Sequence, residues 1–427
     1  MKNNYKICVI GLGYVGLPLA SLFSTKYTTI GYDHDKARVD ALNEGHDATM
    51  ELSDVQLQSA LEEGFSCSSK IEDIKDCNIY IVAVPTPVDE NNRPDLKPIL
   101  SASETVGRVI SKGDIVIYES TVYPGVTEEE CIPVIERVSG LKLNEDFFAG
   151  YSPERVNPGD KEHSVEKIIK VTSGSNPKTA GIVDALYNSV LVNGTHRAPS
   201  IRVAEASKII ENSQRDVNIA FMNELAKIFN AMGIDTGDVI DAAASKWNFI
   251  KLKPGLVGGH CISVDPYYLI QKAQVYGVFP RVMSSARRLN DGMGEYVALQ
   301  AIKCMNKKGV LVKDAHILLL GFTFKENCPD TRNTKVMDIY HTLREYSPNI
   351  SVYDPWADPS AVRGNYGIEL FEGSPEELSG SFDAVILCVA HSCFLEIDVR
   401  SLLSDREKGV VYDVKGVLDK TQTDGRL

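Results

Sequence analysis

The chain has 427 residues, more than one hydrophobic core usually supports, so its length predicts two or three domains. Hydrophobic residues make up 43% and charged residues 24%, as is typical of soluble globular proteins. The net charge of −13, from 45 basic and 58 acidic side chains, argues against a nucleic-acid-binding protein, which would carry a basic face. A phosphorylated small ligand is not excluded, because one pocket can be positive on an acidic protein.

The amino-terminal sequence is basic and then apolar, as a signal peptide would be. Glycines and a proline interrupt the apolar run within residues 11–18, however, and no small-residue cleavage site follows. No stretch approaches the roughly 20 apolar residues of a membrane span. The nine cysteines are odd in number and form no C-x-x-C pair, which favours a reducing cytoplasm. We therefore expect a cytoplasmic protein with no membrane contact.

Four short apolar runs occur in the first part of the chain. They cover residues 6–11, 28–32, 78–84 and 114–118, and the stretches between them have helical length and periodicity. Alternation of strand and helix predicts βαβ units around a parallel sheet. We place the first domain, a doubly wound Rossmann domain, at residues 1–198.

The middle of the chain, residues 199–308, has a different pattern. Residues 200–232 keep helical periodicity without proline, which predicts a long helix that bridges domains or lies at a subunit interface. A Gly/Pro-rich loop follows at residues 251–266. Helical pattern resumes at residue 266 and continues to about 307, so this region is predicted to be a helical central domain.

Strand and helix alternate again in the last part, with strands predicted at residues 315–324, 350–353, 384–390 and 409–414. This alternation of strand and helix predicts a second doubly wound domain at residues 309–427. The predicted fold is therefore α/β, with two doubly wound Rossmann-like domains joined by a helical central domain with a long connecting helix.

A glycine-rich turn follows the first predicted strand. Gly11, Gly13 and Gly16 form a G-x-G-x-x-G pattern between a strand and a helix, and Asp33 ends the second strand. In dinucleotide-binding folds the backbone of this turn approaches the pyrophosphate, and the carboxylate accepts hydrogen bonds from the adenosine ribose. A carboxylate there repels a 2′-phosphate, so NAD is favoured over NADP, although basic residues follow closely. The alternative is a glycine turn without a ligand.

Two further loops follow predicted strands at the same edge of the sheet. One contains Pro85 and Thr86, and the other contains Thr121. Ligands of open α/β sheets bind beyond the carboxyl ends of the strands, so we expect the two loops to frame one crevice. Ordinary turn chemistry is the alternative for each loop taken alone.

Lys208 and Asn212 form a polar pair on the predicted long helix. Their spacing of four residues puts them on one helix face. Taken alone, such a pair more often belongs to a solvated polar face than to a functional site.

Cys261 stands in the Gly/Pro-rich loop, in the sequence G-G-H-C. The two glycines free the backbone so that a thiol can be presented to a ligand, and His260 and Asp265 could supply polar or acid–base help. The alternative is a loop cysteine with no role. A third polar segment, residues 321–332, follows the first strand of the last domain and would meet an anionic ligand or form a solvated loop.

Together and in this order, the motifs resemble those of the UDP-glucose/GDP-mannose dehydrogenase family. The resemblance runs from G-L-G-Y-V-G to Y-D-V-K-G and includes V-A-V-P-T-P, S-P-E-R, K-x-x-x-N, G-G-H-C and T-F-K-E-N. It implies an enzyme that oxidises the C6 alcohol of a nucleotide sugar to a carboxylate with NAD. In that family the central cysteine, matched by Cys261, attacks an aldehyde. Oxidation of the resulting thiohemiacetal gives a thioester, which water hydrolyses.

The resemblance also implies roles for individual residues. Lys208 and Asn212 hold the developing oxyanion, Asp265 acts as an acid–base residue with a bound water, Thr121 helps to position that water, and Glu154 assists hydrolysis. Arg38 lies on the adenosine side of the cofactor and Arg332 near the nicotinamide. The implied cofactor-binding residues are Gly11, Gly13, Tyr14, Val15, Gly16, Asp33, Arg38, Pro85, Thr86, Thr121 and Arg332. The implied substrate-binding residues are Glu154, Arg155, Lys208, Asn212, Arg215, Gly258, His260 and Lys325, and no metal site is implied.

The segment before the cysteine bears on the substrate. UDP-glucose enzymes usually carry G-F-G-G-S-C there, whereas this chain has P-G-L-V-G-G-H-C followed by V-D-P-Y-Y-L. The pattern resembles the branch that acts on UDP-N-acetylhexosamines for bacterial capsules and O-antigens, and within it the glucosamine and galactosamine enzymes. We expect UDP-N-acetylglucosamine or its C4 epimer as substrate, with UDP-N-acetylmannosamine or UDP-glucose as alternatives.

Two rival functions fit the sequence less well. A two-electron dehydrogenase of the 6-phosphogluconate type shares the first domain, the long helix and a Lys/Asn pair. It needs neither Cys261 nor a second doubly wound domain. A non-enzymatic NAD-sensing protein would be expected to have lost some of the polar residues, all of which are present.

The long helix also predicts a homodimer. It carries more apolar side chains than one face of a domain linker needs, and such a surface usually meets a partner. These side chains are Ile209, Ile210, Val217, Ile219, Ala220, Phe221, Leu225 and Ile228.

Overall fold

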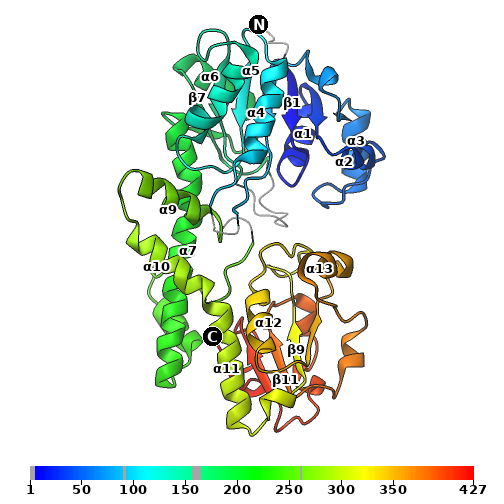
Figure 1. Ribbon diagram of the computed structural model, residues 1–427, viewed down its shortest axis with the longest axis vertical. Coiled ribbons are helices and arrows are strands. Elements are labelled where there is room, and N and C mark those ends of the chain that lie inside the picture. The colour runs from blue at the N-terminus through cyan, green and yellow to red at the C-terminus, as the bar shows by residue number, and fades with distance from the viewer. Residues whose placement is uncertain (1–4, 90–92, 156–164, 260–261) are drawn as a thin grey trace. The chain divides into compact units, whose positions relative to one another are not determined.

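The computed structural model describes residues 5–89, 93–155, 165–259 and 262–427 (Figure 1). The chain divides into two compact units. The first consists of Met1–Glu211 and Tyr267–Val278, and the second of Asn212–Pro266 and Phe279–Leu427. Each unit is built on a sheet of its own.

An eight-stranded sheet forms the first unit, in the order β3-β2-β1-β4-β5-β6-β7-β8. Neighbouring strands are parallel except β6 and β7, which are antiparallel. The strands are β1 (Lys6–Ile10), β2 (Thr28–Tyr32), β3 (Ser66–Ser68), β4 (Ile79–Val82), β5 (Ile115–Tyr118), β6 (Phe148–Tyr151), β7 (Lys170–Gly174) and β8 (Thr195–Arg197). The order reverses between β1 and β4, and ligands of such sheets bind beyond the carboxyl ends of these strands.

Helices cover both faces of this sheet (Figure 1). On one face Ile7 and Val9 of β1 share a hydrophobic cluster with residues of α1 and α6. On the other face Cys8 and Ile10 share a cluster with α4 and α5. Burial on both faces explains why the central strands are continuous apolar runs. The helices are α1 (Gly16–Ser24), α2 (Lys36–Asn43), α3 (Asp54–Glu62), α4 (Lys97–Val109), α5 (Ile132–Ser139) and α6 (Pro177–Asn188).

The four strands predicted in this unit are confirmed as β1, β2, β4 and β5. The sequence did not predict β3, β6, β7 and β8. These strands have three to five residues. Three of them mix small or polar residues with apolar ones, as in FAGY and KVTSG, and β8, with the sequence THR, has no apolar residue. Such short mixed runs lack the periodicity that identifies a strand.

One long helix, α7 (Ile201–Met232), continues from the first unit into the second. Its 32 residues include no glycine or proline, so no residue interrupts the hydrogen-bond ladder. This confirms the predicted long helix. The helical stretch predicted from residue 266 is three helices, α9 (Asp265–Val275), α10 (Arg281–Asp291) and α11 (Met293–Lys307). An additional helix, α8 (Thr236–Ala244), was not predicted.

The second unit contains a five-stranded parallel sheet in the order β10-β9-β11-β12-β13. Its strands are β9 (Ile317–Leu320), β10 (Ile350–Tyr353), β11 (Ala384–Leu387), β12 (Val410–Asp413) and β13 (Gly425–Arg426). Helices α11 and α12 (Val336–Arg344) share a hydrophobic cluster with one face. Short 3-10 turns, η5 (Ser392–Leu395) and η6 (Val399–Leu402), contribute to the cluster on the other face. Helix α13 (Pro359–Tyr366) follows β10 in the chain.

The predicted α/β fold is confirmed, since both sheets are of the Rossmann-like parallel type and the segment between them in sequence is helical. The division at residues 198 and 308 stays a prediction, because the helices of the central segment are shared between the two compact units. Within the described part of the chain, no helix is long and apolar enough to span a bilayer.

Candidate active site

The turn after β1 is tightly packed at its two ends. Gly11 adopts a φ of +93°, and a Cβ on Gly16 would lie 1.7 Å from the carbonyl oxygen of Gly11, so no larger residue fits there. A Cβ on Gly13 would meet no described atom within 4 Å. Gly13 is therefore the open part of the turn, and it stands just before α1, where a helix N-terminus favours an anion.

Asp33 follows β2 and braces this turn. Its Oδ2 accepts the backbone N–H of Leu12 at 2.9 Å, and its Oδ1 accepts that of Asp35 at 3.0 Å. The side chain keeps 14% of its surface exposed, so the carboxylate can still accept hydrogen bonds from a ligand.

Arg38 is held by protein groups on most sides. Its guanidinium donates to the carbonyl of Leu12 at 2.9 and 3.1 Å and to Asp47 at 2.6 Å. Burial alone would raise the pKa of Asp47, but hydrogen bonds from Thr49, Leu52 and Arg38 hold it below its usual value. The Nη1 atom of Arg38 is buried and has no hydrogen-bond partner among the described residues. A buried donor of this kind, beside the glycine turn, fits a ligand acceptor.

The loops after β4 and β5 lie side by side. Thr86 Oγ1 donates to the carbonyl of Thr121 at 2.6 Å, and Ser120 Oγ donates to the carbonyl of Val84 at 2.6 Å. Tyr268 of α9 donates from its hydroxyl to the carbonyl of Thr86 at 2.7 Å. The two loops that the sequence singled out therefore form one hydrogen-bonded edge, and Tyr268 is a member that sequence reasoning missed.

Glu154 belongs to a buried ionic cluster behind β6. The ammonium of Lys170, fully buried on β7, lies 2.6 Å from Glu119 Oε2 and 3.9 Å from Glu154 Oε2, and donates to the carbonyl of Pro153 at 3.2 Å. Tyr187 donates from its hydroxyl to the other oxygen of Glu119 at 2.5 Å. Burial, together with the charge of Glu154, raises the pKa of Glu119 to about 7 against the opposing effect of Lys170. The cluster fixes the carboxylate of Glu154 close to a buried cation.

Arg155, predicted to bind substrate, makes contacts within the protein. Its Nη1 donates to the carbonyl of Ile169 at 2.9 Å, and its Nη2 lies 2.8 Å from Glu211. Its backbone N–H donates to Glu154 Oε1 at 2.6 Å. These bonds tie the S-P-E-R segment to α7 and to the residue that precedes β7.

Lys208 and Asn212 are both buried on α7, with 7% and 8% of their surface exposed, which rules out a solvated polar face. One turn earlier, Glu205 is fully buried and accepts the backbone N–H groups of Gly125 and Thr127 at 2.6 and 2.9 Å. Burial raises the pKa of Glu205 to about 7, although the two backbone bonds oppose the shift. Sequence reasoning missed Glu205, because its partners are some 80 residues away in the chain.

In the second unit, Asp265 starts α9 and is 2% exposed. Asn212 donates from Nδ2 to Asp265 Oδ2 at 2.5 Å. The structure therefore brings together two residues that the sequence assigned to the same chemistry.

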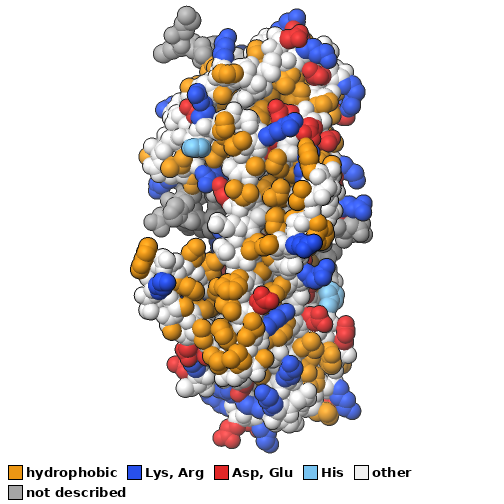
Figure 2. All heavy atoms as spheres, turned by 90° about the vertical axis from the view of Figure 1, so that its left-hand side faces the viewer, with side chains coloured by type: hydrophobic (Ala, Val, Ile, Leu, Met, Phe, Trp, Pro, Cys, Tyr) orange, Lys and Arg blue, Asp and Glu red, His pale blue; other side chains and the backbone are white. Residues whose placement is uncertain are grey.

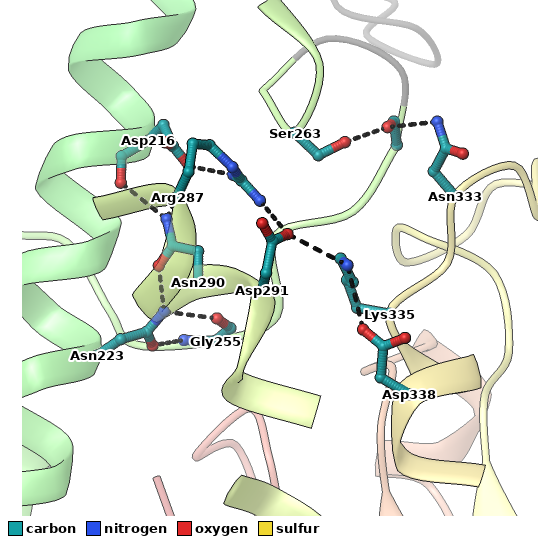
Figure 3. Close-up of polar contacts among 11 residues, drawn as sticks. Asp216, Asn223, Gly255, Ser263, Arg287, Asn290, Asp291, Asn333, Lys335 and Asp338 are labelled. Carbon is teal, nitrogen blue, oxygen red and sulfur yellow. Dashed lines mark hydrogen bonds and ion pairs between the residues drawn. The ribbon is translucent and has the colours of Figure 1, made fainter. Parts of the chain in front are cut away.

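Gly258 and Gly259, which precede the cysteine, are packed too closely against neighbouring residues to carry a side chain. A Cβ on Gly258 would come within 2.7 Å of the carbonyl oxygen of Asn333, and one on Gly259 within 2.8 Å of the ring of Phe324. The Gly259 carbonyl accepts from Asn333 Nδ2 at 3.2 Å and from Ser263 Oγ at 2.5 Å (Figure 3). The glycines thus allow close contact with the segment that contains T-F-K-E-N. His260 and Cys261 themselves lie outside the described residues.

The segment after β9 is organised by a buried pair. Asp354 accepts the backbone N–H groups of Phe322 and Thr323 at 2.6 and 2.9 Å, and His391 Nε2 lies 3.0 Å from the same carboxylate oxygen. Burial alone would raise the pKa of Asp354, but its bonds to His391 and the backbone hold it below its usual value. Sequence reasoning missed both Asp354 and His391.

The three remaining predicted side chains in this unit differ in exposure. Arg332 pairs with Asp330 at 2.6 Å and keeps 48% of its side chain exposed. Lys325 is half-buried, and Arg215 is exposed on α7. A basic side chain with an accessible end is suited to bind a phosphate.

The glycine turn lies where the strand order of a mostly parallel sheet reverses, and the chain also buries acid–base groups. These are the features of an NAD-dependent dehydrogenase. Models of the UDP-glucose/GDP-mannose dehydrogenase family match the chain in three consecutive parts. These are the NAD binding domain at residues 5–191, the central domain at 202–292 and the UDP binding domain at 318–420. The chain belongs to the UDP-glucose/GDP-mannose dehydrogenase family, which confirms the predicted family and cofactor.

Individual relatives are similar over their full length. The chain is 54% identical to a UDP-N-acetyl-D-glucosamine 6-dehydrogenase of Pseudomonas aeruginosa, covering 100% of both chains. It is 51% identical to an enzyme of the same name from Salmonella typhi, covering 100% of this chain and 99% of the relative. A solved structure of a UDP-N-acetyl-D-mannosamine dehydrogenase from Pyrococcus horikoshii matches with a TM-score of 0.88 and 28% identity, covering 99% of this chain and 98% of that one.

Proposed function

We propose that the protein oxidises the C6 alcohol of UDP-N-acetyl-D-glucosamine to a carboxylate, with two NAD reduced for each sugar. The observation that carries this proposal is identity of 54% and 51%, over the whole chain, to two enzymes named for that substrate. Identity to the mannosamine enzyme of known structure is much lower, at 28%. The C4 epimer, UDP-N-acetylgalactosamine, is the second candidate, because the loop sequence before Cys261 fits both sugars.

The first unit fits NAD. The open backbone at Gly13, the partly exposed carboxylate of Asp33 and the buried, unbonded Nη1 of Arg38 lie around one turn. Tyr14, Val15, Pro85, Thr86, Thr121 and Arg332 complete the cofactor-binding set that we propose. When held there, NAD would supply the hydride acceptor for both oxidations.

Lys208 and Asn212 are proposed to stabilise negative charge on the C6 oxygen. A buried ammonium and a side-chain amide are suitable donors, because a water-poor site strengthens their attraction to an oxyanion. After the first oxidation, the Cys261 thiolate attacks C6 of the aldehyde and forms a thiohemiacetal. That adduct carries a C6 hydrogen that can leave as hydride, and its loss gives a thioester.

Hydrolysis of the thioester is assigned to the acidic residues. Water adds to C6, the C–S bond breaks, and the products are the carboxylate and the free thiol of Cys261. We propose that Asp265 and Glu154 take up and return the protons, with Thr121 positioning the water. Asp265 is oriented by Asn212, and Glu154 by the ionic cluster around Lys170.

We propose a separate function for each of the three predicted domains. Residues 1–198 bind NAD, residues 199–308 provide the central lysine and cysteine, and residues 309–427 bind the UDP group. The proposed ligands of the UDP-sugar are Glu154, Arg155, Lys208, Asn212, Arg215, Gly258, His260 and Lys325. We place the enzyme in the cytoplasm, where NAD and nucleotide sugars are made, and its uronate product in a bacterial capsule or O-antigen.

A homodimer through α7 is proposed from an apolar stripe. Val203, Ile210, Phe221, Ile228 and Met232 are 46% to 63% exposed. At 3.6 residues per turn they lie within about 40° of one another around the helix axis. Hydrophobic side chains are frequent on the face shown in Figure 2. Exposed apolar side chains aligned along one helix are better explained by a partner than by solvent.

Two of the apolar side chains that the sequence predicted at the dimer surface do not lie there. Ile209 and Ala220 are buried inside the protomer, at 0% and 4% exposure, and contribute nothing to an exposed surface.

The substrate assignment is tested by a panel of sugars. NADH formation is measured under one set of conditions for UDP-N-acetylglucosamine, UDP-N-acetylgalactosamine, UDP-N-acetylmannosamine and UDP-glucose. We expect kcat/KM for the first or second sugar to exceed that for UDP-glucose by roughly 10²–10⁴, because a site built for an acetamido group is left with unpaired polar groups by a hydroxyl. Two NADH per sugar are expected, and one NADH per sugar would instead indicate a two-electron dehydrogenase.

A further inference from the structure

Asn223 makes a two-point contact with the backbone that leads to the cysteine (Figure 3). The N–H of Gly255 donates to Asn223 Oδ1 at 2.8 Å, and Asn223 Nδ2 donates to the carbonyl of Gly255 at 3.0 Å. Asn223 is fully buried on α7. Because one planar amide binds both polar groups of the same residue, it fixes the direction of the chain at Gly255 as well as its position.

The opposite end of this segment is held by the same helix face. Asn212 donates to Asp265, and Asn212 and Asn223 are eleven residues apart. Eleven residues correspond to about three helical turns, so the two asparagines point to the same side of α7 roughly 16 Å apart. Residues 255–265, which include Cys261, are therefore tied at both ends to one rigid element.

The amide of Asn223 has a defined orientation. Its Nδ2 also donates to Asn290 Oδ1 at 2.8 Å, and Asn290 Nδ2 donates in turn to the carboxylate of Asp216 at 2.7 Å. A carboxylate only accepts, so Asp216 faces the Nδ2 end of Asn290. The Oδ1 end of Asn290 then faces Nδ2 of Asn223, which leaves Asn223 Oδ1 to accept the N–H of Gly255. Arg287 pairs with Asp216 and so supplies the compensating charge (Figure 3).

We propose that Asn223 is a positioning residue for the nucleophile, acting through the backbone of residues 255–265 without contact with substrate or cofactor. The inference rests on the proposed function, in which Cys261 is the nucleophile. The relay of Asp216, Asn290 and Asn223 fixes the backbone at Gly255, and a fixed start of the segment limits the positions from which the thiol can reach the aldehyde. A displacement of about 1 Å at a reacting atom can reduce a rate by roughly 10²-fold.

The test compares Asn223→Ala with Asn230→Ala. Asn230 is on the same helix and donates to the hydroxyl of Tyr296 at 3.1 Å, away from residues 255–265. For Asn223→Ala we expect kcat to fall about 10- to 100-fold, with the KM values for NAD and UDP-N-acetylglucosamine changed less than about threefold. The Asn230→Ala variant should keep its kcat.

A second readout follows the thiol itself. The rate at which iodoacetamide alkylates Cys261, measured by mass spectrometry of its peptide, should change at least about fivefold in Asn223→Ala, while the rate at the exposed Cys393 stays constant. If Asn223→Ala does not fold, Asn290→Ala keeps Asn223 and removes its orienting acceptor, together with the bonds from Asn290 to Asp216. That variant should show the same loss of kcat and the same change in alkylation, to a smaller extent.

Two results overturn the inference. One is normal kcat and normal alkylation of Cys261 in folded Asn223→Ala or Asn290→Ala. The other is an equal loss of kcat in Asn230→Ala, which would show a general effect of perturbing α7. Failure of the proposed function is distinguished by Cys261→Ala, because an enzyme that still forms the carboxylate without this thiol needs no positioned nucleophile.

Discussion

Asp33 and Asp354 make the same contact in the two sheets. Each follows the second strand of its βαβ unit and accepts the backbone N–H of the residue after a glycine of positive φ. Asp33 accepts from Leu12 at 2.9 Å, and Asp354 accepts from Phe322 at 2.6 Å. The side chain of Asp33 is 14% exposed, whereas that of Asp354 is fully buried. The carboxylate of Asp33 can therefore also accept hydrogen bonds from a ligand, whereas that of Asp354 contributes to the fold alone.

This pair gives a matched test of cofactor binding. Asp33→Ala should raise the KM for NAD about tenfold or more and weaken the preference for NAD over NADP. The reason is the loss of charge-assisted bonds to the ribose and of repulsion toward a 2′-phosphate. Asp354→Ala should lower the melting temperature without changing the NAD/NADP ratio. Steady-state kinetics with both cofactors check this, and an unchanged ratio in Asp33→Ala would show that the carboxylate does not face the ribose.

Lys208→Ala should reduce kcat by about 10²–10³, the effect of losing one oxyanion donor, with little change in KM for the UDP-sugar. Lys227→Ala is the control, since Lys227 is on the same helix and lies 5.0 Å from the ring centre of Tyr296. Normal turnover together with a lower melting temperature in Lys208→Ala would assign this lysine a structural role only.

Cys261→Ala should abolish carboxylate formation and leave binding of NAD and the UDP-sugar nearly intact, because the thiol is needed only after the first oxidation. Calorimetry measures binding, and mass spectrometry measures products. Cys261→Ser is expected to accumulate product at the aldehyde level or as an adduct. Acid formation near the wild-type rate in Cys261→Ala would rule out the covalent mechanism.

Stability should fall as pH rises from about 5 to 7, in part because of Glu205. Burial raises its pKa from 4.5 to about 7, so the folded state holds a proton that the unfolded state releases. Stabilisation from this proton is complete below pH 4.5 and is lost as pH rises through 7, with a slope of up to about 1.4 kcal/mol per pH unit. Urea unfolding of Glu205→Gln should show a shallower pH dependence. Glu224→Gln, at an exposed position on the same helix, should keep the wild-type slope.

The dimer should depend on the stripe along α7. Light scattering at micromolar concentration should give twice the chain mass of 46.9 kDa for the wild type. Replacing Phe221 and Ile228 by Asp should give the mass of one chain, because buried carboxylates without partners oppose association. Val55→Asp, at an apolar position 81% exposed on α3, should remain a dimer. A wild-type protein that is only monomeric would contradict the proposal.

The central strands and α7 could be predicted because their signal is local. A strand buried on both faces is a continuous apolar run, and a helix without glycine or proline keeps its periodicity. The glycine turn was equally predictable, since a G-x-G-x-x-G pattern between a strand and a helix is a local signal in the sequence. The sequence alone therefore determined the central strands of both Rossmann-like sheets, the long helix and the family.

Only the tertiary structure shows which polar groups are buried and paired around the candidate site. Lys170, Glu205 and Asn223 look like ordinary polar residues in the sequence, and their partners lie 51, 78 to 80 and 32 residues away. The sequence left open whether Lys208 and Asn212 face solvent, because helical spacing defines a face but not what covers it. Only the fold buries these groups and pairs them, since a hydrogen bond or ion pair depends on distance in space and not on separation along the chain.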